Sequence, residues 1–294
     1  MSVLPRATRS MRIIALPLTP VSCALGKSVE HLTYYHFVTP PPPKHRGNTW
    51  VKWATTKSAE LWAGLGRAQE GSWKRKAFLY GERIIDRLDF EELALKSLDP
   101  SLGPKIGHFT NPDVKAKPTP VIPLIYPPSA CISPLPHLRS LLEKRTPRHK
   151  KGFYIWMLAA PLTTPFMLIP IIPNFPFFFC VWRSWSHYRA FKASQYLEAF
   201  LEQGAIVPET SADLDAIYAE YGPQKESSPS SSPSQSSSSP SSPNASDPPP
   251  PSLLLSREAV PVLEKQLDLP PGSSFVGDVY RALEQARLRV ETKQ

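Results

Sequence analysis

The feature that most constrains this chain is an apolar stretch, Phe153–Trp182, which contains no Asp, Glu, Lys or Arg. A straight helix of about 20 apolar residues crosses a bilayer core, so this length and lack of charge favour membrane insertion. Prolines interrupt the stretch at Pro161, Pro165, Pro170, Pro173 and Pro176. Each proline removes a backbone donor and disfavours helix just before it, and freed carbonyls find no partners in hydrocarbon. A straight single span is therefore not expected.

A Pro-broken apolar hairpin fits this stretch better. One predicted leg is Phe153–Leu168 and the other is Phe175–Leu201, with the turn at Pro170–Pro176. Because two full spans need about 40 residues, such a hairpin would be re-entrant or shallow in the membrane. The alternative is a hairpin of two buried core helices in a soluble protein.

The flanks of the stretch support the membrane interpretation. Cations precede it at Lys144, Arg145, Arg148, Lys150 and Lys151 and follow it at Arg183, Arg189 and Lys192. The positive-inside rule places two such basic ends on the same side of a membrane. The aromatic residues Trp182, Trp185 and Tyr188 beside these arginines resemble an interfacial belt.

The N-terminal segment, residues 1–43, has the composition of a targeting sequence. Several arginines precede the first acidic residue, Glu30, as is typical of a mitochondrial presequence. Prolines weaken the amphipathic helix of such a signal, so an extended or strand-like start is the alternative. The β-branched and aromatic residues of Ile13–Leu16 and Tyr34–Val38 are compatible with short strands.

Residues 44–98 predict basic amphipathic helices, one starting at Asn48 or Thr49 and a second over Ser72–Leu88. Their tryptophans recur at helical spacing on a basic surface, which suits a membrane interface. The alternative is that the tryptophans of the first helix pack against the second. Residues 99–143 are Pro-rich, so we predict an extended surface segment there and no long helix.

Residues 144–222 comprise the apolar hairpin and the helix that continues from it, which Gly204 ends. Residues 223–252 form a Ser/Pro tract that cannot bury a core and is predicted to be a disordered linker. Residues 253–294 form a C-terminal helical element with two apolar faces, one over Val260–Leu269 and one over Phe275–Ala286. The predicted fold class is therefore mainly α: a helical membrane-associated protein with a Pro-broken apolar hairpin.

The sequence patterns point away from an enzyme. No P-loop, GxGxxG, HExxH or GxSxG motif occurs, so we predict no catalytic residues and no cofactor. The three cysteines are far apart and lack ligand spacing, so neither a disulfide framework nor a metal site is expected. We interpret His187 as a polar residue at a membrane boundary or helix surface, because no carboxylate lies near it in sequence. The net charge of +9 fits either an acidic lipid leaflet or nucleic acid.

Three stretches carry a resemblance to a known family: Met11–Leu18, Pro173–Phe179 and Arg183–Ala190. The second holds a Pro-Asn-x-Pro-Phe-Phe turn, and the third an aromatic-Ser-His-x-Arg-Ala helix. Together they resemble the mitochondrial potassium–proton exchange-related family of fungi and plants. The C-terminal helices over Leu267–Leu288 also look similar. The resemblance covers roughly residues 11–222 and 254–290, which leaves the Ser/Pro tract as an insertion.

The resemblance implies a protein of the inner mitochondrial membrane that is a component or regulator of potassium–proton exchange and thus of mitochondrial volume. Transporters that couple ions normally keep ionisable groups inside the membrane. Since Phe153–Trp182 has none, an accessory role is favoured over that of the exchanger itself. The alternative is a membrane-surface scaffold or assembly factor with no role in ion transport.

The candidate functional residues belong to the predicted turn and to the helix after it: Pro173, Asn174, Pro176, Arg183, His187 and Arg189. Asn174 is the polar residue that offers a carbonyl oxygen at the turn. Inner-membrane lipids are the expected partners, with other membrane proteins or further copies of this chain. A nucleic-acid partner is not expected.

Overall fold

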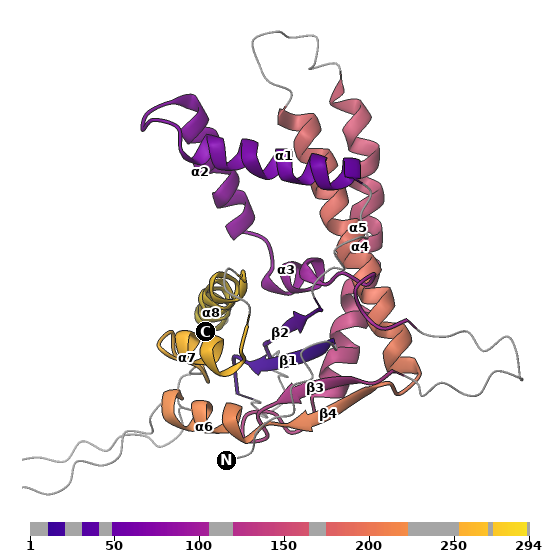
Figure 1. Cartoon of the computed structure of the whole chain (residues 1–294), viewed down its shortest axis with the longest axis vertical. Helices are drawn as coiled ribbons and strands as arrows, with labels where there is room; N and C mark the ends of the chain where they lie inside the picture. The colour runs from indigo at the N-terminus through magenta and orange to yellow at the C-terminus, as the bar shows by residue number, and fades with distance from the viewer. Residues whose placement is uncertain are drawn as a thin grey trace, which may run out of the picture. The chain divides into compact units, whose positions relative to one another are not determined.

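The computed structural model describes residues 11–20, 31–40, 49–105, 120–164, 175–222, 253–269 and 273–292. These residues form four strands and eight helices (Figure 1). Pro173, Asn174 and the Ser/Pro tract 223–252 lie outside the described residues, so the predictions made for them stay predictions. The chain divides into two compact units. The first comprises Met1–Ile14, Tyr35–Ile125 and Ser133–Glu209, and the second Ala15–Tyr34, Tyr126–Ile132 and Thr210–Gln294.

A small sheet has the strand order β2-β1-β3-β4. Its strands are β1 (Arg12–Pro17), β2 (Thr33–Val38), β3 (Ile122–Tyr126) and β4 (Ile206–Thr210). Strands β1 and β3 are parallel, with Ile13 opposite Leu124 and Ile14 opposite Ile125. The side chains of β1 from Ile13 to Leu16 have no exposed surface. A strand buried on both faces is apolar throughout and does not alternate, which is why its period is weak in the sequence.

The first unit contains five helices of the described chain. They are α1 (Thr49–Gly66), α2 (Trp73–Asp86), α3 (Phe90–Ser97), α4 (Pro134–Leu162) and α5 (Phe175–Glu202). Helix α4 packs against α5 more extensively than any other pair of elements, and the two form the long hairpin seen in Figure 1. The hairpin predicted from the sequence is thus present, although its first leg begins well before Phe153. The second leg ends as predicted, because Gly204 has a left-handed φ of 64°.

The two predicted helices within residues 44–98 are confirmed as α1 and α2. Ser72 caps α2 by accepting a hydrogen bond from the backbone of Lys74. Trp62 of α1 packs on Phe78 of α2, with ring centroids 5.1 Å apart, whereas Trp53 is exposed. The packing interpretation therefore holds for Trp62, and helix α2 buries none of its residues.

The prediction for residues 99–143 is wrong in two places. Strand β3 lies there with Ile122 and Leu124 fully buried, and α4 begins at Pro134. Proline is tolerated in the first turn of a helix, because its missing N–H would have no partner there anyway. Further along, α4 also contains Pro147 and Pro161, so proline content alone underestimated the length of this helix.

The second unit contains α6 (Ala212–Tyr221), α7 (Ala259–Gln266) and α8 (Phe275–Thr292). The Tyr218 hydroxyl of α6 donates to the carbonyl oxygen of Pro17 over 2.9 Å, and the Leu254 amide donates to the carbonyl oxygen of Leu18. The predicted apolar face of α8 is confirmed. Its buried residues are Phe275, Val279, Ala282, Leu283 and Ala286. The mainly helical fold class is likewise confirmed, with the small sheet as an addition.

Candidate functional site

Helices α4 and α5 pack along each other, and α5 has one buried face. Along α5, Ala190, Ala193 and Ser194 have no exposed surface, and Leu197 and Phe200 continue the same buried stripe one and two turns later. This spacing of three and four residues places them on one helix face. One to two turns earlier in the chain, α5 carries the polar residues Arg183, Ser186 and His187, and the side chains of Ser186 and His187 are buried.

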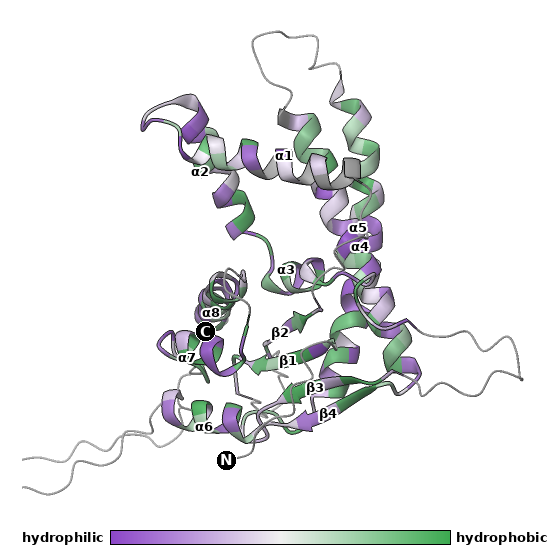
Figure 2. Ribbon diagram, viewed as in Figure 1, coloured by the Kyte–Doolittle hydropathy of each residue, from purple (hydrophilic) through white to green (hydrophobic). Residues whose placement is uncertain are grey.

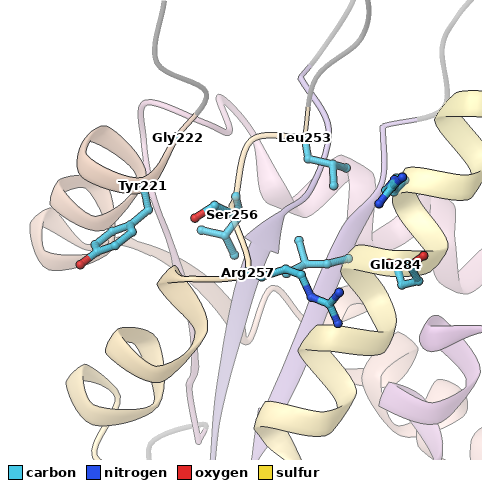
Figure 3. Close-up of a pocket in the computed structure, with 9 residues that line it drawn as sticks. Tyr221, Gly222, Leu253, Ser256, Arg257 and Glu284 are labelled. Carbon is cyan, nitrogen blue, oxygen red and sulfur yellow. The ribbon is translucent and has the colours of Figure 1, made fainter.

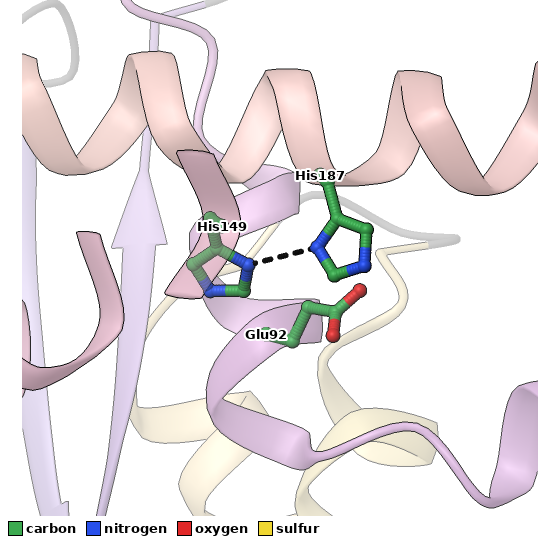
Figure 4. A group of neighbouring side chains, drawn as sticks. All are labelled: Glu92, His149 and His187. Atoms are coloured by element: carbon green, nitrogen blue, oxygen red, sulfur yellow. Dashed lines mark hydrogen bonds between the residues drawn. The ribbon is translucent and has the colours of Figure 1, made fainter. Parts of the chain in front are cut away.

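His149 of α4 and His187 of α5 face each other across this interface. Their Nδ1 atoms are 3.2 Å apart, and the two side chains are 1% and 6% exposed. Figure 4 shows both rings turned toward each other, with Glu92 beside them. Gly152 makes this approach possible, since a Cβ there would lie 2.8 Å from the His187 ring. The Nε2 atom of His149 is buried and has no hydrogen-bond partner among the described residues.

Glu92 of α3 supplies the negative charge of the cluster. Arg183 binds its carboxylate through both terminal nitrogens: Nη1 contacts Oε1, and Nη2 lies 3.0 Å from Oε2. The Ser186 hydroxyl also donates to Oε1, over 3.4 Å. Two parallel N–H bonds to one carboxylate are the strongest and most directional form of this ion pair. Glu92 is 5% exposed, so the pair is largely removed from water.

A second set of ion pairs surrounds the cluster. Arg145 of α4 binds Asp89 at 2.7 Å and also contacts Glu91. Arg148, one turn along α4, lies 3.5 Å from Asp89. Through these pairs the acidic start of α3 is held to the basic middle of α4. Part of the cationic run that precedes the apolar stretch therefore forms ion pairs within the chain.

Burial sets the protonation states of the three central groups. It lowers the pKa of His149 to about 4, while the carboxylate of Glu92 acts in the opposite direction. Burial also lowers the pKa of His187, and the positive charge of Arg183 lowers it further. Burial alone would raise the pKa of Glu92, but the hydrogen bonds and charge of Arg183 outweigh it. At neutral pH the cluster therefore holds two neutral imidazoles and one ionised carboxylate.

The donor atoms of Glu92, His149 and His187 all lie within 4.8 Å of one another, which is close enough for a shared ion. Their chemistry fits a proton better than a metal. Both oxygens of Glu92 are already bound by Arg183, and a divalent ion would add two positive charges beside that guanidinium. A single proton adds one charge and needs only a bare ring nitrogen.

The outer end of the hairpin is apolar and exposed. In Figure 2 this end is mostly green, with a purple band below it. Large side chains at least 44% exposed are Tyr154, Ile155, Met157, Leu158 and Leu162 on α4 and Phe178, Val181 and Trp185 on α5. Across the described ranges, no helix has both the length and the apolar character needed to cross a membrane. The predicted membrane attachment stays a prediction.

A shallow pocket of about 290 Å³ lies in the second unit (Figure 3). Leucines line much of it, and its two arginines already make contacts within the chain. Arg257 lies over the ring of Tyr280, and Arg287 pairs with Glu291. No titratable cluster comparable to that of His149 and His187 occurs among its lining residues.

The sequence of residues 12–201 matches the model of one protein family, described as mitochondrial K⁺–H⁺ exchange-related. That range covers well over half of the chain. The chain belongs to the mitochondrial K⁺–H⁺ exchange-related family. The matched range contains the whole of α3, α4 and nearly all of α5, so the cluster lies within the part of the chain that defines the family.

Two fungal relatives are similar to this member of the family. An uncharacterised protein of Saccharomyces cerevisiae is 27% identical over 171 residues, which is 51% of this chain and 52% of the yeast protein. This match therefore spans about half the length of that relative. An uncharacterised protein of Schizosaccharomyces pombe is 25% identical over 208 residues, or 70% of this chain and 81% of its own. No solved structure matches the chain.

The predicted site residues of this family member lie in different surroundings in the structure. Arg183 and His187 belong to the buried cluster, whereas Arg189 is half-buried further along α5 and Pro176 is exposed at its start. The interpretation of His187 as a helix-surface residue is wrong, because its side chain is only 6% exposed and Glu92 lies beside it. Glu92 and His149 were missed, since each is remote from His187 in sequence. A sequence feature that could have indicated the site is Gly152, which follows His149 by three residues on the same helix and leaves room for a neighbouring side chain.

Proposed function

We propose that this chain acts at the inner mitochondrial membrane as a component or regulator of potassium–proton exchange. The observation that carries the proposal is the family match over residues 12–201. The family description supports a mitochondrial role related to K⁺–H⁺ exchange, and the inner membrane is where such exchange controls potassium and volume. The cluster of Glu92, His149 and His187 supports the protonic side of the proposal, because it holds a buried acceptor for a proton.

The apolar end of the α4–α5 hairpin supports attachment to lipid. Leu158 and Leu162 on α4 are 67% and 77% exposed, and Phe178 on α5 is 66% exposed. The transfer of such an exposed apolar surface from water into the acyl region of a bilayer is favourable. Next to it, the exposed cations Lys150 and Lys151 are placed to meet acidic headgroups. Anionic inner-membrane lipid is therefore the proposed partner of this end.

The test is potassium-dependent swelling of isolated mitochondria. In potassium acetate, acetic acid carries protons inward, and swelling continues only if those protons leave in exchange for K⁺. Mitochondria that lack the chain should swell several-fold more slowly, and expression of the chain should restore the rate. Nigericin, a K⁺–H⁺ ionophore, should also restore it, because the missing step is the exchange itself. Ammonium acetate serves as the control, since its swelling needs no cation exchange.

Two results would contradict the proposal. Unchanged swelling in potassium acetate without the chain would remove the role in exchange. If the chain still pelleted with membranes after carbonate extraction in that case, the membrane-surface scaffold would become the leading account. A slow rate that nigericin fails to restore would indicate a general membrane defect.

A further inference from the structure

The pairing of His149 with His187 requires a proton between them. Two imidazole Nδ1 atoms at 3.2 Å can bond only if one ring donates and the other accepts. The donating ring is then left with a bare Nε2. We assign the donor role to His149, because the other tautomer would bury an Nε2–H of His149 with no acceptor. The lone pair of His149 Nε2 is the place where the cluster can accept one further proton.

The charges around the pair determine what that proton does. Glu92 and Arg183 neutralise each other, and the imidazoles are neutral, so the inner cluster carries no net charge. Arg145 and Arg148 of α4 also act on the pair through their positive charges. Those charges are balanced by ion pairs with Asp89 and Glu91 at the start of α3. One added proton leaves a buried positive charge without a counterion. Such a charge is strongly unfavourable until water reaches it.

We propose that His149 and His187 form a single proton-binding site, and that binding one proton there separates α4 from α5 and α3 at this level of the hairpin. The proposal deepens the role in exchange: its physiological meaning rests on the proposed function, since it names the residues that take the proton. Once the helices separate, water can hydrate the imidazolium. Glu92 can then pair with the imidazolium in place of Arg183.

The coupling between the proton and the separation follows from linkage. Burial holds the pKa of His149 at about 4, against 6.5 for a free imidazole, so the closed interface binds a proton roughly 300-fold more weakly than the open one. By reciprocity, the proton shifts the equilibrium toward the open interface by the same factor. Between pH 7.5 and pH 5, the opening equilibrium should rise about 30-fold.

The experiment is hydrogen exchange of the purified full chain across pH 5 to 7.5, with amide rates corrected for their intrinsic pH dependence. Amides of α4 and α5 around His149 and His187 should lose about 30-fold in protection as the pH falls. The double variant His149→Gln/His187→Gln should show a ratio near one. His36→Gln should retain the full response, although burial also lowers the pKa of His36 to about 4. NMR titration of the histidine ring carbons follows the pair directly.

The outcomes separate clearly. A pH response that survives in the double variant would overturn the proposal, as would wild-type imidazoles that both titrate near their ordinary value. Should the double variant fail to fold, Gly152→Ala gives a second test, because its methyl group pushes the His187 ring away without removing a titratable group. That variant should raise the pKa of both rings. One Zn²⁺ bound per chain, with loss of the pH response, would make the cluster a metal site instead. Because these measurements use the isolated chain, a negative swelling result leaves them intact and removes only the proposed function.

Discussion

Glu92 of α3 and Arg183 of α5 are 91 residues apart in sequence and meet through both carboxylate oxygens and both terminal guanidinium nitrogens. The pair joins α3 to the hairpin and places the carboxylate of Glu92 beside the two histidines. The neighbouring carboxylates of Asp89 and Glu91 are instead bound by Arg145.

Removing one partner of this pair should be far worse than removing both. Glu92→Gln leaves Arg183 buried without a counterion, and we expect it to lower the free energy of unfolding by about 3 kcal/mol or more. The double variant Glu92→Leu/Arg183→Met leaves no uncompensated charge and should recover most of that loss. Urea denaturation followed by circular dichroism measures both. Equal destabilisation in the single and double variants would contradict this view of the pair.

Stability should fall with acid in a defined window. The folded pKa of His149 lies near 4 and that of a free imidazole at 6.5, so between these values the unfolded chain binds more protons than the folded one. The stabilisation is therefore complete above pH 6.5 and is lost progressively as the pH falls toward 4, by roughly 3 kcal/mol in total. His36 contributes in the same window, since its pKa is also lowered to about 4.

Urea denaturation at several pH values checks this expectation, and substitutions separate the two contributions. His149→Gln should remove one component of the acid loss, and His36→Gln the other. Acid sensitivity that is unaffected by His149→Gln would mean that the histidine pair titrates with its ordinary pKa.

Gly152→Ala should be destabilising despite the higher helix propensity of alanine. The added Cβ would lie 2.8 Å from the His187 ring, so the interface must move, at a cost of about 1–3 kcal/mol. Gly277 of α8 is the matched control, because a Cβ there meets nothing within 4 Å. Gly277→Ala should stabilise the chain by a few tenths of a kcal/mol up to ~1 kcal/mol. Thermal unfolding of the two variants measures the difference in sign.

Binding to vesicles should depend on the apolar end of the hairpin. Leu158→Glu/Leu162→Glu places two charges on this exposed surface and should weaken binding to vesicles with anionic lipid at least tenfold. Ile132→Glu is the control, since Ile132 is 89% exposed but lies elsewhere in the chain. Flotation of the purified protein with vesicles at two salt concentrations measures both variants. Equal binding of the two variants would rule out the hairpin end as the attachment surface.

The helices were largely predictable, and the cluster was not. Local spacing identifies α2, α5 and the buried face of α8, because a helix face depends only on residues three and four apart. The site joins Glu92, His149 and His187 from three helices, and no local pattern relates them. Strand β3 escaped notice for a similar reason, since its parallel partner β1 is remote in sequence and Pro123 disguises it.

The central position of β1 in the sheet constrains the order in which the sheet can form. Strand β1 spans Arg12–Pro17, yet it lies between β2 and β3, and β3 begins only at Ile122. Contacts between segments so distant in sequence make folding slow, because a long loop must close before they form. A chain threaded N-terminus first through a translocation pore would present β1 long before β3 emerged. In that case β1 would lack its partner β3 until residues 122–126 had followed it, so the sheet would form late.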